Sequence, residues 1–120
     1  MTVNKISFTG YNSILKTKWR QGLLPSVKKG FYGDDLTQDN LSVEHLELHC
    51  KGGPTTLDNT VLASKNKNNK RGCKDLNKVI DIAKAKQYLL QFVGVNDEGF
   101  DGDIYVKNII KRLKKLDVLI

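Results

Sequence analysis

The chain has 120 residues, of which 20 are Lys or Arg and 13 are Asp or Glu, so its formal net charge is +7. This length predicts a single domain, residues 1–120, and leaves little room for a second one. The positive charge favours a polyanionic partner such as nucleic acid. No apolar run approaches the ~18 residues of a membrane span, and the first ten residues lack the apolar core of a signal peptide. We therefore expect a cytoplasmic protein without a membrane partner.

The first predicted element is a short helix over residues 12–20, where apolar residues recur at helical spacing. Asn12 or Ser13 could cap its start. Gly22 and Pro25 then interrupt the helical pattern. Residues 26–40 are rich in turn-forming residues and predict an irregular lead-in to the next element.

Apolar and polar residues alternate over residues 41–45, which predicts a short strand that ends in Glu44 and His45. A long loop follows, and residues 60–63 are apolar and β-prone enough for a second strand. Residues 65–72 are so polar that a helix there would depend on tertiary contacts. These elements predict a β-hairpin followed by a helix.

Apolar residues recur at helical spacing again from Leu76 to Gly94, which predicts a longer helix. The acidic stretch over residues 96–103 predicts a solvated connection with a helix cap. The last predicted helix carries an apolar stripe formed by Ile104, Ile109, Leu113 and Leu116. The predicted fold class is α+β, with a hairpin–helix core over about 28–75, an N-terminal helix and a helical extension over 76–120.

The polar residues at the end of the first strand suit hydrolysis of a phosphodiester. A neutral histidine such as His45 can take a proton from water near pH 7. A carboxylate and an amide oxygen, as in Glu44 and Asn68, are hard ligands that can hold Mg²⁺ and leave positions open for phosphate oxygens. The sequence therefore indicates a one-metal phosphodiesterase site.

The segment from Leu41 to Gly72 resembles the HNH endonucleases, whose ββα-metal fold cuts nucleic acid. The likeness rests on Glu44-His45, Lys51-Gly52-Gly53, Asn59, and an Asn-x-x-Arg-Gly ending over residues 68–72. The resemblance implies that His45 is the general base, that Glu44 and Asn68 bind one divalent metal ion, and that Asn59 ties the long loop to the hairpin. It also implies Mg²⁺ as the ion, with Mn²⁺ or Ni²⁺ as alternatives, and DNA as substrate, with RNA still open.

The cations around the last motif are the candidates for contacts with nucleic acid. They are Lys65, Lys67, Lys70, Arg71 and Lys74. Their position beside the implied metal site favours binding of backbone phosphates over a merely solvated face. For the lysines of the last helix, binding of phosphates and a merely solvated face are equally favoured.

The sequence departs from the family pattern at two points. Where many members carry paired cysteines for a structural zinc, this chain has Lys29, Tyr32, Ser64 and Lys67. We therefore expect no structural zinc, and packing by the C-terminal helices is a hypothesis for what replaces it. Glutamate at position 44 stands where aspartate or histidine is commoner, which leaves the metal preference open. Cys50 and Cys73 are expected to be free thiols.

Interpretations without a catalytic role are also open. His45 could be an ordinary half-buried histidine, and His49 is expected at the surface or in a supporting role. The alternative function is a non-catalytic or partner-dependent DNA-binding module that retains the fold, with a protein partner supplying specificity. Oligomeric state is open. The small, Lys- and Asn-rich format resembles nucleases of phages and prophages, which implies the cytoplasm of a bacterial or phage-infected cell.

Overall fold

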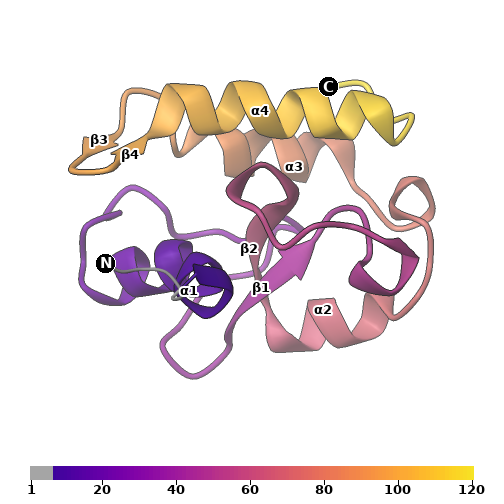
Figure 1. Cartoon of the computed structure of the whole chain (residues 1–120), viewed down its shortest axis with the longest axis horizontal. Coiled ribbons are helices and arrows are strands. Elements are labelled where there is room, and N and C mark those ends of the chain that lie inside the picture. The colour runs from indigo at the N-terminus through magenta and orange to yellow at the C-terminus, as the bar shows by residue number, and fades with distance from the viewer. Residues whose placement is uncertain (1–6) are drawn as a thin grey trace.

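The computed structural model describes residues 7–120, with side chains from residue 14 onward. The regular elements are α1 (Ser7–Arg20), β1 (Leu41–His45), β2 (Thr60–Ser64), α2 (Lys65–Arg71), α3 (Ile82–Leu90), β3 (Asn96–Asp97), β4 (Phe100–Asp101) and α4 (Gly102–Lys115). Three short 3-10 turns are η2 (His49–Lys51), η3 (Leu57–Asn59) and η4 (Leu76–Lys78). In Figure 1 the β1–β2 hairpin lies between α2 and the layer formed by α3 and α4. The predicted α+β class is confirmed.

The hairpin and the following helix form one continuous unit. Strands β1 and β2 pair antiparallel, with Leu41 opposite Ser64 and His45 opposite Thr60. Strand β2 runs directly into α2, and the Ser64 hydroxyl caps this helix by accepting from the backbone N–H of Lys67. The predicted strand–loop–strand–helix order is therefore present, and the polar helix α2 is stabilised by contacts described below.

The two C-terminal helices and the lead-in segment complete the hydrogen bonding of β2, which has β1 on one edge only. The Phe31 N–H donates to the Leu62 carbonyl at 2.9 Å. The Leu62 N–H donates to the Tyr88 hydroxyl of α3 at 2.9 Å, and the Tyr105 hydroxyl of α4 donates to the Thr60 carbonyl at 2.8 Å. The two hydroxyls lie 2.9 Å apart. Because an unpaired buried backbone group costs about as much as a lost hydrogen bond, these tyrosines let a two-stranded sheet be buried.

An aromatic cluster joins the lead-in segment to the C-terminal helices. Ring centroids lie 5.7 Å apart for Phe31 and Tyr88, 5.0 Å for Tyr88 and Phe92, and 4.8 Å for Phe92 and Tyr105. All four side chains are buried. Such tilted and edge-on contacts add to the burial of apolar area, so this cluster fixes the helical layer against the hairpin. No helix within residues 7–120 is both long enough and apolar enough to cross a membrane.

Three predictions about the helices need correction. Helix α1 begins at Ser7, so Asn12 and Ser13 lie inside it and not at a cap; their side chains are outside the described part. The helix predicted from Leu76 to Gly94 is divided, because the Asp81 side chain accepts from the Lys84 N–H and starts α3 there. On α4, Ile104 is 57% exposed and Tyr105 occupies the buried stripe. The acidic stretch forms the short β3–β4 hairpin, and Asp101 supplies the helix cap that was expected in this stretch.

Candidate functional site

His45 ends β1 and is half-buried. Its Nε2 lies 3.0 Å from the Thr55 hydroxyl in the loop between the strands. The ring stands edge-on to His49, with centroids 5.8 Å apart. Burial, followed by the nearby charges of His49 and Arg71, lowers the pKa of His45 below its ordinary value. The imidazole is therefore neutral at pH 7 and can accept a proton. His49 is exposed in η2, as predicted.

Glu44 precedes His45 and points to the other face of β1, as successive strand residues do. Its carboxylate is 3% exposed, accepts a 2.7 Å hydrogen bond from the Tyr32 hydroxyl, and pairs with Arg71 at 3.5 Å. Burial raises the pKa of Glu44, and the contacts with Tyr32 and Arg71 oppose that rise. Neither partner was assigned to Glu44 from the sequence, where Tyr32 stood only as a replaced zinc ligand. The Glu44 carboxylate and the His45 ring contact different groups, Tyr32 and Arg71 in the first case and Thr55 in the second.

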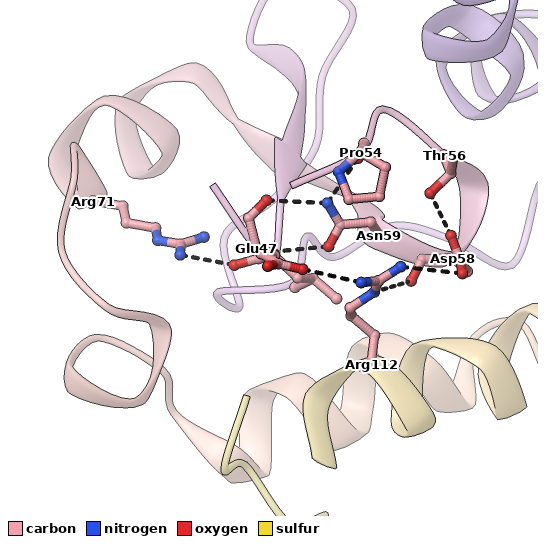
Figure 2. Close-up of polar contacts among 8 residues, drawn as sticks. Glu47, Pro54, Thr56, Asp58, Asn59, Arg71 and Arg112 are labelled. Carbon is pink, nitrogen blue, oxygen red and sulfur yellow. Dashed lines mark hydrogen bonds and ion pairs between the residues drawn. The ribbon is translucent and has the colours of Figure 1, made fainter. Parts of the chain in front are cut away.

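Asn59 is fully buried and closes the loop that follows His45 (Figure 2). Its Oδ1 accepts from the Glu47 N–H at 2.9 Å, while its Nδ2 donates to the carbonyls of Glu47 and Pro54 at 3.0 and 2.8 Å. Gly53 lets the loop pass closely, since a Cβ there would lie 1.9 Å from the Glu47 carbonyl oxygen. Both N–H donors of this amide and one lone pair of its oxygen are thus used, and together they connect the two ends of one loop.

Asn68 lies on α2 and faces β1. Its Nδ2 donates to the Ser42 hydroxyl at 2.9 Å and to the Val43 carbonyl at 3.1 Å. Ser42 and Glu44 share a face of the strand, because alternate residues do. Asn68 and Glu44 therefore lie on the same side of the hairpin, whereas His45 contacts the loop on the other side.

Arg71, at the end of α2, is 4% exposed, and its guanidinium is used inside the protein. It donates to the backbone carbonyls of Lys74, His45 and Leu46 at 3.1, 2.5 and 2.8 Å. Together with the ion pair to Glu44, these contacts anchor α2 to the end of β1. Arg71 was predicted from the sequence as a phosphate contact, but its geometry is that of a buried anchor.

A basic hollow of about 340 Å³ opens beside this anchor. It is lined by Tyr32, Lys67, Lys70, Arg71, Lys74, Val79, Asp81 and Lys84. Four of the five predicted nucleic-acid residues are in this lining; Lys65 is exposed on α2 but is not part of it. Lys84 comes from α3, where nothing in the sequence indicated it. Its stem lies over Gly33, whose φ of 91° suits glycine and where a Cβ would come within 2.4 Å of the lysine.

Arg112 connects α4 to the same loop that Asn59 closes (Figure 2). Its guanidinium pairs with Glu47 at 3.0 Å and with Asp58 at 3.2 Å, and it is only 12% exposed. The sequence left two equal interpretations for the lysines of this helix and assigned no role to Arg112. The double ion pair gives it a structural role.

No family model, no curated protein and no solved structure matches this chain. The site must therefore be judged on its own geometry. The described residues contain no group of three or more His, Cys, Asp or Glu side chains that could hold a metal ion. The metal prediction accordingly depends on Glu44 and Asn68, one carboxylate and one amide.

Proposed function

We propose that this protein is a divalent-metal-dependent endonuclease of the HNH type, which hydrolyses phosphodiester bonds in DNA. The observation that carries the proposal is the arrangement of residues 41–71. A hairpin and a helix hold a neutral histidine at a strand end, a buried asparagine closing the following loop, and a second asparagine facing the strand. These are the residue types, in the order and on the elements, that the family resemblance implied.

His45 would act as general base toward the attacking water. It is the last residue of β1, and local twist at the strand end would turn its ring and the Glu44 carboxylate toward one phosphate although they leave opposite faces of the strand. When Nε2 carries the ring proton, its N–H donates a hydrogen bond to the Thr55 hydroxyl. Nδ1 then keeps the lone pair that accepts a proton from water. Thr55 follows Pro54, whose carbonyl is held by Asn59. In this proposal Thr55 positions the base directly, and Asn59 does so through the loop.

Glu44 and Asn68 would hold the divalent ion, and their donor chemistry suits Mg²⁺, which prefers oxygen ligands. Tyr32 and Arg71 both contact Oε2 of Glu44, and Asn68 turns its Nδ2 toward β1. An ion would be held through the carboxylate of Glu44 and the amide oxygen of Asn68. When bound, such an ion stabilises the negative charge that develops on the phosphate and leaving oxygen. Mn²⁺ and Ni²⁺ are the alternatives.

The lysines of the basic hollow would bind backbone phosphates on the Glu44 side of the hairpin. They are Lys67, Lys70, Lys74 and Lys84. Arg71 lines the hollow as well, but its donors are engaged by backbone carbonyls, so we assign it to holding Glu44. Binding through lysines predicts affinity that falls steeply with salt concentration and depends little on sequence.

The test is cleavage of supercoiled plasmid with Mg²⁺, Mn²⁺, Ni²⁺ or EDTA. His45→Ala should lower the cleavage rate by about 10²–10⁴-fold, the usual contribution of a general base, while DNA binding persists. His49→Ala is the matched control, because His49 is the exposed neighbour of the same ring, and it should cut nearly normally. Full activity in His45→Ala would refute the assignment.

One observation favours a second candidate, a DNA-binding module that keeps the fold without cutting alone. The Glu44 carboxylate is buried and already paired with Arg71 and Tyr32, an arrangement that also serves a purely structural purpose. Salt-sensitive DNA binding without cleavage under any divalent ion would support this candidate. Cleavage restored by a protein partner would indicate that the partner completes the site and supplies specificity.

A further inference from the structure

Two exposed cysteines lie next to each other beside the candidate site, although they are far apart in the sequence. Cys50 belongs to η2, Cys73 follows α2, and their Sγ atoms are 3.9 Å apart. Adjacent residues hold the two segments together independently of the sulfurs, because Lys51 and Asp75 form an ion pair at 2.8 Å. The thiols are free, as the sequence predicted, but their proximity was not foreseen.

We propose that Cys50 and Cys73 form a reversible disulfide, so that the pair is a redox modification site. A disulfide needs an S–S distance of about 2.05 Å, which requires the sulfurs to approach by roughly 2 Å. Both side chains are exposed, so rotation about their Cα–Cβ bonds meets little packed structure. This site is independent of the proposed nuclease chemistry, which uses neither sulfur.

The oxidant that we name is a low-molecular-weight disulfide such as oxidised glutathione. One cysteine thiolate attacks a glutathione sulfur, a mixed disulfide forms, and one glutathione leaves as a thiolate. The second cysteine thiolate then attacks the protein sulfur of the mixed disulfide and releases the second glutathione. The two protein thiols lose two electrons and two protons, and these reduce the oxidised glutathione to two glutathione thiols.

The crosslink would enclose the part of the chain that carries the candidate site. The closed loop from Cys50 to Cys73 contains β2 and α2, and with them Asn59 and Asn68. Closing this loop restricts the unfolded chain, so the oxidised protein is expected to unfold at a temperature higher by roughly 10 °C. The same crosslink would tie the end of α2 to the loop that follows β1.

The experiment compares the purified full chain in oxidised and in reduced glutathione, with Cys50→Ser and Cys73→Ser as matched controls. We expect the oxidised wild type to lose the mass of two hydrogens without a disulfide between two chains. A peptide map without reductant should link Cys50 to Cys73, and reductant should reverse both the link and the rise in Tm. Neither serine variant should show that rise. Stable glutathione adducts on both cysteines, or disulfide-linked dimers in place of the internal link, would overturn the proposal. No DNA is involved, so the result stands apart from any failure of the nuclease assignment.

Discussion

The hairpin–helix segment, residues 41–71, and the C-terminal segment, residues 76–120, bury different kinds of side chain. Among the side chains that the structure describes, all the buried polar or charged ones lie in the first segment: Glu44, Asn59, Thr60, Ser64 and Arg71. The second segment buries aliphatic and aromatic side chains. Polar groups removed from water cost free energy unless each finds a partner, whereas apolar burial is favourable without directional contacts.

This difference indicates that the two segments have different structural roles. The buried polar groups of residues 41–71 fix positions, since hydrogen bonds and ion pairs have defined geometry. The C-terminal helices contribute apolar area and reach back into the first segment, through Tyr88 and Tyr105 to β2 and through Arg112 to the loop. These contacts support the hypothesis that helical packing does here what a zinc site does in many HNH proteins.

Replacing the buried cation of the first segment should have the largest effect. Arg71→Leu leaves the Glu44 carboxylate buried without its charge partner, and we expect a loss of about 3–5 kcal/mol in the free energy of unfolding. Removing the charge as well, in Arg71→Leu with Glu44→Gln, should recover the part of the loss that comes from the unpaired carboxylate. The backbone carbonyls that Arg71 contacts stay without its N–H groups in both variants. Chemical denaturation of the wild type and both variants measures these free energies of unfolding.

The pH dependence of that loss has a definite sign. Burial raises the pKa of Glu44 in the folded wild type, and removing Arg71 raises it further. A carboxyl whose folded pKa lies above its unfolded value binds more protons when folded, so stability falls as pH rises from about 4.5 through the folded pKa. The penalty of Arg71→Leu should therefore shrink toward acidic pH. A penalty that is the same at pH 4 and pH 7 would contradict the pairing.

Asn59→Ala tests the loop closure and should have the next largest effect. The variant leaves partly buried backbone groups of Glu47 and Pro54 without partners and empties a fully buried site, which predicts a loss of about 2–3 kcal/mol. Asn66→Ala on exposed α2 is the matched control and should change stability by less than about 0.5 kcal/mol. If the two variants are equally stable, Asn59 does not hold the loop.

How far the sequence predicted this structure differs between the two segments for physical reasons. Period-two alternation located β1, and a β-prone apolar run located β2. Helix α2 was expected from its place after the hairpin, because its polar sequence makes it depend on tertiary contacts. The partners of Glu44 could not be predicted, since Tyr32 and Arg71 reach it from different elements and no periodicity encodes such a contact.

In the C-terminal segment the helical spacing of apolar residues correctly predicted helices, but it did not show where they begin. The Asp81 cap starts a new helix inside an uninterrupted apolar pattern. On α4, Ile104 and Tyr105 are neighbours, and tertiary contacts place Tyr105 inward, where it donates to β2 and packs against Phe92. The nearness of Cys50 to Cys73, and of Lys84 to the basic hollow, follows from the tertiary fold alone.

The smallest expected effect concerns Thr55, which tests whether the first segment positions a base or only buries a histidine. Thr55→Val removes the hydroxyl that contacts His45 Nε2 while keeping the shape of the side chain. One hydrogen bond is worth about 1 kcal/mol, so kcat for DNA cleavage should fall roughly 5–10-fold. Thr55→Ser keeps a hydroxyl and should retain most of the activity.

The pH–rate profile separates this positioning role from a merely structural one. Burial lowers the pKa of folded His45, so the neutral base persists below pH 6.5 and the acid limb of wild-type cleavage lies under that value. Because the pKa of His45 is lower in the folded state than in the unfolded state, protonation of the ring opposes folding. The free energy of unfolding should therefore decrease as pH falls from about 6.5 through the folded pKa. An Nε2–H that donates to Thr55 favours the protonated ring, because an imidazolium is the stronger donor. Loss of the hydroxyl should therefore lower the pKa of His45 further and move the acid limb of Thr55→Val downward. A lower kcat with an unmoved limb in Thr55→Val would mean that the hydroxyl supports the loop and does not orient the base.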